Sequence, residues 1–297
     1  MPLLYYGMLR KEGPKLNSRT LLLLATVSLA TDMARSNAEI RGSEAPNSPV
    51  TVEDKYFDMG GYRLHAVMAG KGKPSVVFEA GMGDGTGSWE KVQPEISKMA
   101  QTFSYDRPGL GKSDRAPAPH DLNQSADELH ALLQKSGIPA PYILVGHSMG
   151  GLIVRVFAYR YPSETAGMVL VDPSDEGTDA RLHSKMTPEQ WDSYRAWMKK
   201  HLENPIMRLD MEAMTSGQEA AAAVPLPSVP KILLSASQIE ESSKVFREVA
   251  IELHKEWVQK TPNAELVPVP TSEHYIQIVA PETVISAIKR LATEIGR

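Results

Sequence analysis

The sequence predicts an α/β fold in which a mostly parallel sheet is flanked by helices, with a helical cap insertion. Three observations support this prediction. Apolar segments typical of buried strands alternate with segments of helical periodicity along most of the chain. One strand and the helix after it are joined by a glycine-rich turn, Gly146-His147-Ser148-Met149-Gly150. The alternation stops once, at about residues 174–228, where Met- and Trp-rich helical segments predict the cap.

The composition is that of an ordinary globular protein. The chain has 297 residues, of which 42% are hydrophobic and 23% charged, and this length fits one large α/β domain with an insertion. A formal net charge of -4 does not favour nucleic acid as a partner. The absence of cysteine excludes disulfides, a thiol nucleophile and thiolate metal sites. The histidines do not show the spacing of metal ligands, so we expect neither a metal nor a cofactor.

Residues 1–30 have the pattern of a secretory signal peptide. A short apolar segment ends in small residues, which predicts cleavage after Ala30. An uncleaved membrane anchor or a first helix packed on the domain is the alternative. We therefore expect an exported protein, periplasmic or secreted, if the leader is cleaved, and a membrane-anchored one otherwise. The basic residues that precede the apolar segment are Arg10, Lys11, Lys15 and Arg19.

Residues 31–51 are polar and contain two prolines, so they predict a flexible lead-in to a domain at 52–297. That domain is expected to open with a hairpin, because strand-like segments at 55–59 and 63–69 flank Gly60-Gly61.

The next expected strand, residues 75–79, runs into a glycine-rich loop at 80–85. Glycines at a strand end allow the backbone to approach a ligand closely. A helix is expected at 89–99. A second helix follows from apolar residues at helical spacing between 122 and 133, and we interpret Ser125 and Glu128 as its capping box.

The remaining elements follow from the same periodicities. Short β-branched and apolar runs predict strands, and a 3.6-residue period predicts helices. The expected strands lie at 102–105, 142–145, 166–171, 231–236 and 265–269, and the expected helices lie at 152–158, at 243–259 and from Pro281 onward.

Reactive groups of parallel sheets gather at the carboxyl ends of the strands. The glycine-rich loop, Ser148, Asp172 and His274 all fall at such ends. A serine hydroxyl is a poor nucleophile unless a base takes its proton and donors stabilise the oxyanion. A tight Gly-x-Ser-x-Gly turn would present Ser148 with its oxygen exposed. The alternative is a glycine-rich turn with an incidental serine.

Several motifs in this order resemble the α/β-hydrolase superfamily, over nearly the whole chain from about Tyr56. The serine in the turn favours the esterase, lipase and peptidase-like branch over the branches with an aspartate nucleophile. The motifs that carry the resemblance are Glu79-Ala80-Gly81-Met82-Gly83, Asp106-Arg107-Pro108-Gly109-Leu110-Gly111-Lys112-Ser113, Gly146-His147-Ser148-Met149-Gly150-Gly151, Leu170-Val171-Asp172-Pro173 and Ser272-Glu273-His274-Tyr275-Ile276-Gln277.

The resemblance implies that Ser148 is the nucleophile and His274 its general base. The triad acid usually follows the strand at 231–236, but no aspartate stands there in this chain. Some family members carry the acid one strand earlier, which implies Asp172. The alternative acids are Glu240 and Glu241.

The resemblance also implies an oxyanion hole made of the backbone N–H groups of Met82 and Met149. The expected activity is cleavage of a carboxylic ester or a related acyl bond (EC 3.1.1) through an acyl-enzyme. The alternatives are another bond (peptide, lactone or carbon–carbon), acyl transfer with the same triad, and a non-catalytic hydrolase-like binding or receptor protein. The Met and Trp residues of the cap favour a small-molecule substrate with an apolar acyl or aryl group. The sequence leaves the oligomeric state open.

Overall fold

The computed structural model describes residues 50–296, apart from 117–120, 224 and 240–242. The expected leader, the lead-in up to residue 49, and the alternative acids Glu240 and Glu241 lie outside the described residues. Within the part of the chain that is described, no helix has the length and apolar character needed to cross a membrane.

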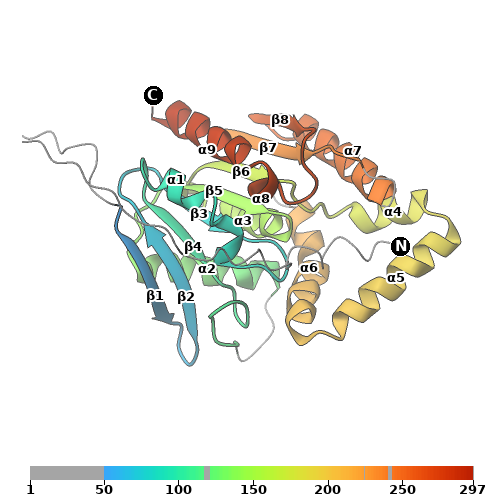
Figure 1. The fold of residues 1–297 in the computed structure, drawn as a ribbon, viewed down its shortest axis with the longest axis horizontal. Coiled ribbons are helices and arrows are strands. Elements are labelled where there is room, and N and C mark those ends of the chain that lie inside the picture. Colours follow the sequence, from blue (N-terminus) through green and yellow to red (C-terminus); the bar gives the residue numbers. More distant parts are fainter. Residues whose placement is uncertain (1–49, 117–120, 224, 240–242, 297) are drawn as a thin grey trace, which may run out of the picture. The chain divides into compact units, whose positions relative to one another are not determined.

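The described chain forms one eight-stranded sheet with the strand order β1-β2-β4-β3-β5-β6-β7-β8 (Figure 1). The hairpin β1–β2 and the pairing of β2 with β4 are antiparallel, and every other pairing is parallel. The mostly parallel sheet predicted from the sequence is therefore confirmed. The strands are β1 Val52–Asp58, β2 Arg63–Ala69, β3 Ser75–Glu79, β4 Thr102–Tyr105, β5 Tyr142–His147, β6 Thr165–Val171, β7 Lys231–Ala236 and β8 Ala264–Val269.

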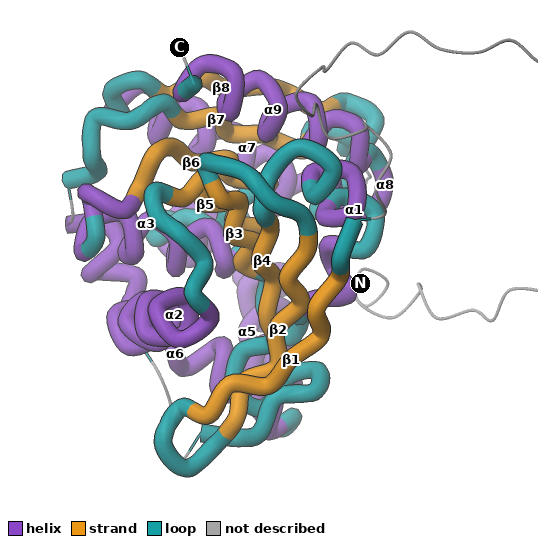
Figure 2. Tube along the Cα trace, turned by 90° about the vertical axis from the view of Figure 1, so that its left-hand side faces the viewer, coloured by secondary structure: helices purple, strands orange, loops and turns teal. Residues whose placement is uncertain are grey.

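Helices cover both faces of the sheet, as Figure 2 shows. One apolar core is formed between the sheet and the helices α2, α3 and α6, and a second between the opposite face and the helices α1 and α9. Two faces buried in this way explain why the central strands are apolar throughout. The helices are α1 Gln93–Ile96, α2 Leu122–Ser136, α3 Met149–Arg160, α4 Thr178–Lys185, α5 Pro188–Leu202, α6 Pro205–Ala223, α7 Lys244–Lys260, α8 Ile276–Val279 and α9 Pro281–Ile295, with 3₁₀ turns η1 Thr86–Trp89 and η2 Pro162–Glu164.

Two sequence predictions on local structure are wrong in detail. The single helix expected at 89–99 is a 3₁₀ turn followed by the short α1, because Pro94 lacks the N–H that a continuous helix would need and is tolerated only in its first turn. The capping box of α2 is Asp121 with Gln124, one turn before the expected Ser125 and Glu128. Gly137 ends α2 in the left-handed conformation.

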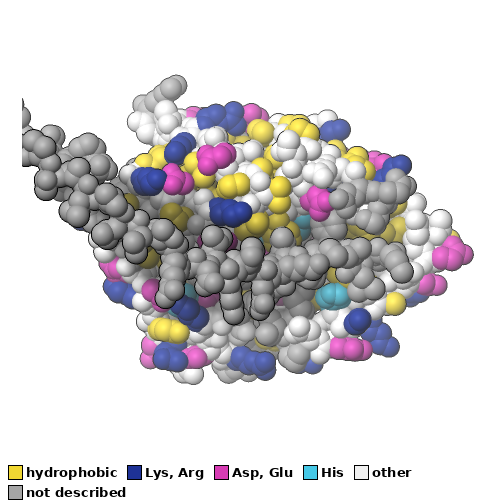
Figure 3. Space-filling model, viewed as in Figure 1, with side chains coloured by type: hydrophobic (Ala, Val, Ile, Leu, Met, Phe, Trp, Pro, Cys, Tyr) yellow, Lys and Arg dark blue, Asp and Glu magenta, His cyan; other side chains and the backbone are white. Residues whose placement is uncertain are grey.

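The chain forms three helices, α4, α5 and α6, between the end of β6 and the start of β7. Helix α6 packs so closely on α2 that a methyl group at Gly217 would lie 2.6 Å from Cβ of Leu122. Helices α4 and α5 join α7 through a small cluster around Leu182 and Tyr194, against which Met and Trp side chains of this segment pack. Acidic and basic side chains are scattered over the described surface of the face shown in Figure 3.

Candidate active site

The turn between β5 and α3 holds Ser148 in a strained conformation. Its backbone has φ 52° and ψ −122°, a region that side-chain-bearing residues rarely adopt. A methyl group at Gly146 would lie 2.6 Å from the carbonyl oxygen of Gly150, and one at Gly150 would lie 2.6 Å from that of Ala80. Strain of this kind persists only where the surroundings enforce it, and it occurs preferentially at functional sites. The geometry is that of a tight strand-to-helix turn that presents the side chain at its tip.

The close packing of Gly150 leads to a test of the turn. Gly150→Ala is expected to lower the free energy of unfolding by about 1–3 kcal/mol. Its methyl group must displace backbone at Glu79 and Ala80, so any reaction that depends on the position of Ser148 should slow about 10²-fold. Denaturant unfolding and initial rates measure the two effects. Gly87→Ala is the matched control, since its methyl group would meet no atom within 4 Å. Equal behaviour of the two variants would contradict this account of the turn.

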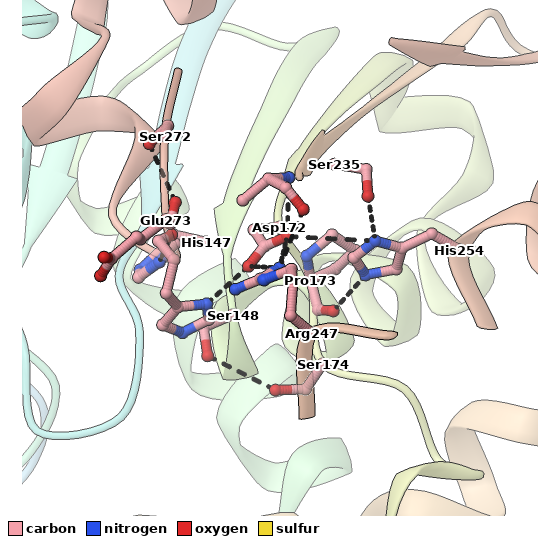
Figure 4. A network of polar contacts seen from close by, with 12 residues as sticks. His147, Ser148, Asp172, Pro173, Ser174, Ser235, Arg247, His254, Ser272 and Glu273 are labelled. Carbon is pink, nitrogen blue, oxygen red and sulfur yellow. Dashed lines mark hydrogen bonds and ion pairs between the residues drawn. The ribbon is translucent and has the colours of Figure 1, made fainter. Parts of the chain in front are cut away.

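His274 and Asp172 form a hydrogen-bonded pair at the carboxyl end of the sheet. The Nδ1 atom of His274, in the loop after β8, lies 2.7 Å from Oδ2 of Asp172, which directly follows β6. Ser148 is adjacent, since its N–H donates to the carbonyl of Val171 at 3.2 Å. The hydroxyl of Ser148 lies 3.4 Å from that of Ser174 (Figure 4). The structure therefore brings together the serine, histidine and aspartate that the sequence singled out.

Asp172 is buried and surrounded by donors. Nη1 of Arg247, on α7, lies 2.8 Å and 2.9 Å from the two carboxylate oxygens, and the N–H of Ala236 donates to Oδ1 at 3.0 Å. Burial alone would raise the pKa of Asp172, but the hydrogen bond from His274 and the charge of Arg247 hold it well below its ordinary value. Asp172 is therefore an ionised carboxylate that can hold His274 in one orientation.

A second histidine, His254, completes the surroundings of this carboxylate. Its Nε2 donates to the carbonyl of Pro173 at 2.9 Å, so its Nδ1, 2.8 Å from the Ser235 hydroxyl, accepts (Figure 4). Burial lowers its pKa, which favours the neutral form. The sequence interpretation missed both Arg247 and His254. Their spacing of seven residues places them on one face of α7, and that was the available signal.

His147 is buried directly beside the serine. Its ring lies 4.7 Å from that of His274, and its Nε2 donates to the backbone carbonyl of His274 at 3.1 Å. Burial and the neighbouring His274 lower the pKa of His147 to about 3. A neutral His147 therefore helps to fix the loop that carries His274.

The glycine-rich loop after β3 passes over the same site. A methyl group at Gly81 would lie 3.4 Å from Cβ of Ser148. Met82 is half-buried in this loop, and Met149 is buried as the first residue of α3. A helix N-terminus favours negative charge, so Met149 stands where a main-chain donor can face an anion. Among the described residues, no cluster of three or more His, Asp or Glu side chains is arranged to hold a metal ion.

Comparison with known proteins identifies the class. A model of the alpha/beta hydrolase fold family matches residues 74–245, more than half of the chain. The protein therefore belongs to the α/β-hydrolase family.

Solved structures share the fold at low identity. A putative lipase from Acinetobacter baumannii superposes with a TM-score of 0.64 at 17% identity, covering 82% of this chain and 92% of that one. A 2-hydroxy-6-oxo-6-phenylhexa-2,4-dienoate hydrolase from Rhodococcus superposes with a TM-score of 0.61 at 19% identity, covering 82% and 99%.

Curated relatives match over shorter stretches. The uncharacterized protein YqjL of Bacillus subtilis is 33% identical over 122 residues, 41% of this chain and 48% of the relative. A putative carbamate hydrolase, RutD, of Klebsiella pneumoniae is 37% identical over 102 residues, 34% of this chain and 38% of the relative. The chain spans less than half the length of the first curated relatives that it matches. These relatives include hydrolases, in keeping with the family.

Proposed function

We propose that the protein is a serine hydrolase that cleaves a carboxylic ester or a related acyl bond through an acyl-enzyme on Ser148. The observation that carries this proposal is the hydrogen bond between His274 and the buried Asp172, beside a serine held at positive φ. A strained, pre-positioned hydroxyl next to an oriented imidazole has the arrangement required for nucleophilic catalysis.

The geometry supports a two-step mechanism. Because Nδ1 of His274 donates to Asp172, Nε2 carries the lone pair and takes the proton as Oγ of Ser148 bonds to the acyl carbon. The N–H groups of Met82 and Met149 would stabilise the oxyanion. His274 then gives the proton to the leaving alcohol as the ester C–O bond breaks. A water molecule, deprotonated by His274 in its turn, releases the acid and regenerates Ser148.

Asp172 is the preferred acid because it already holds His274. For the substrate we propose a small molecule with an apolar acyl or aryl group, on the ground of the Met and Trp residues in the sequence between β6 and β7.

A fluorophosphonate probe tests the function directly. The probe reacts only with an activated serine, so we expect stoichiometric labelling that maps to the peptide containing Ser148. Labelling of His274→Ala should be much slower, because its hydroxyl has lost the base. Folded protein that stays unlabelled would overturn the proposal and favour a binding protein. Product analysis on ester, lactone and peptide substrates, with and without alcohols as acceptors, identifies the bond and any acyl transfer.

A further inference from the structure

Asp210, on helix α6, contacts the glycine-rich loop directly. Its Oδ2 accepts hydrogen bonds from the N–H of Gly83 at 2.7 Å and from Nη2 of Arg107 at 2.8 Å, and its Oδ1 lies 3.3 Å from Nε of Arg107. Asp210 and Arg107 are both buried. A carboxylate from the segment between β6 and β7 is therefore bonded to a loop that precedes it by 127 residues.

Arg107 extends this contact to the other side of the loop. Its Nη1 donates to Oε1 of Glu79 at 2.7 Å and to the carbonyl of Ala80 at 2.8 Å, and its Nη2 donates to the carbonyl of Gly81 at 2.7 Å. Burial opposes the charge of this guanidinium, but the neighbouring Asp210 and Glu79 outweigh it and raise the pKa of Arg107. Arg107 therefore stays charged and needs a buried carboxylate as its partner.

These bonds anchor the loop on both sides of Met82. Gly81 is held through its carbonyl by Arg107, and Gly83 through its N–H by Asp210. The orientation of the Met82 peptide is therefore set by one guanidinium and one carboxylate. An oxyanion donor must point where charge develops in the transition state, and small displacements are costly.

Helix α6 is a firm support for this carboxylate. Met211 and Ala213, next to Asp210, are buried, and Gly217 fits closely against Leu122 of α2. The same helix continues the segment formed by α4 and α5. We propose that Asp210 is a positioning residue, through which α6 sets the orientation of the Met82 N–H and hence the stabilisation of the oxyanion. The inference rests on the proposed serine-hydrolase function.

Kinetics of Asp210→Ala and Asp210→Asn on a p-nitrophenyl ester test the proposal. The alanine variant loses the anchor at Gly83 and the carboxylate that holds Nη2 of Arg107, so we expect kcat to fall about 10–100-fold with KM changed less than about two-fold. Asparagine can keep its amide oxygen at the position of Oδ2, but it lacks the charge and turns an NH₂ toward Nε of Arg107, so kcat of this variant should fall about 3–10-fold, less than for alanine. Affinity for an alkyl boronic acid, which mimics the tetrahedral transition state, should fall in parallel with kcat/KM. Affinity for the product carboxylic acid should not change.

Glu212→Ala supplies the control. Glu212 lies on the same helix, is exposed, and pairs only distantly with Arg208 at 3.7 Å, so its removal should leave kcat and inhibitor binding unchanged. Denaturant unfolding of each variant shows that the protein measured is native, and Asp210→Asn serves as the test if Asp210→Ala fails to fold.

Unchanged boronic acid affinity in Asp210→Ala, or in Asp210→Asn if the alanine variant does not fold, would overturn the role of Asp210. So would equal losses of affinity for the boronic acid and the product acid. An unlabelled Ser148 in the wild-type protein would instead contradict the proposed function itself, so the two failures are distinguishable.

Discussion

Replacing Ser148 with alanine is expected to lower kcat for ester hydrolysis about 10⁶-fold while the protein stays folded. The hydroxyl is the proposed nucleophile, and no neighbour can replace it in an acyl-enzyme mechanism. The adjacent Ser174 hydroxyl, 3.4 Å away, lies after β6 and not at the tip of the turn. Initial rates and acyl-enzyme bursts measure the loss. A variant that keeps more than about a hundredth of the wild-type rate would contradict a role for Ser148 as nucleophile.

Ser148→Gly separates chemistry from strain at the same position. The backbone at Ser148 has φ 52°, which glycine adopts without cost but alanine does not. We expect the glycine variant to be as inactive as the alanine variant, yet more stable than the wild type by about 1–3 kcal/mol. Denaturant unfolding of the three proteins measures this difference. A glycine variant no more stable than the alanine variant would show that the turn stores no strain.

The elements with local signals could be predicted from the sequence, and the contacts between distant elements could not. Gly146 and Gly150 flank Ser148 within one turn, so the steric demand of that turn is visible in the sequence. The partners of the site come from further away. Arg247 is 75 residues from Asp172, and Asp210 is 103 residues from Arg107. Only the folded sheet brings such pairs together.

The acid illustrates the same limit. Carboxylates follow both β6 and β7 in the sequence. Periodicity alone therefore does not show which of these strand ends carries the acid that contacts His274. What favours Asp172 is the donor set formed by Ala236, Arg247 and His274, which come from three other parts of the chain. These donors compensate the burial of the Asp172 charge, which would otherwise be destabilising, and they are brought together only by packing.

Asp172→Asn is expected to lower kcat about 10⁴-fold. Oδ1 of Asp172 accepts from Ala236 and Arg247, so the amide oxygen of asparagine should take that position and turn its NH₂ toward His274. Nδ1 of His274 would then have to accept, and the proton would move to Nε2, where the base is needed. The wrong tautomer therefore accounts for the loss, and rates on p-nitrophenyl esters measure it.

Stability and pH distinguish this effect from simple unfolding. Asparagine leaves Arg247 without its buried counter-charge, which costs about 3–5 kcal/mol. The double variant Asp172→Asn with Arg247→Met removes both charges and should regain stability but not activity.

The pH dependence follows from the low pKa of Asp172. The contribution of ionised Asp172 to the free energy of unfolding is fully present above about pH 4, and it is lost as the pH falls through the folded-state pKa. Loss of wild-type activity on mild acidification should thus not arise from protonation of Asp172.

The alternative acids provide the decisive comparison. Glu240→Gln and Glu241→Gln are expected to keep kcat within about two-fold of the wild type, because the carboxylate that meets Nδ1 of His274 is that of Asp172. A large loss in either glutamine variant, with an active Asp172→Asn, would move the acid to the loop after β7. Asp172 would then be a partner of Arg247 that stabilises the junction of β6, β7 and α7 and takes no part in the chemistry.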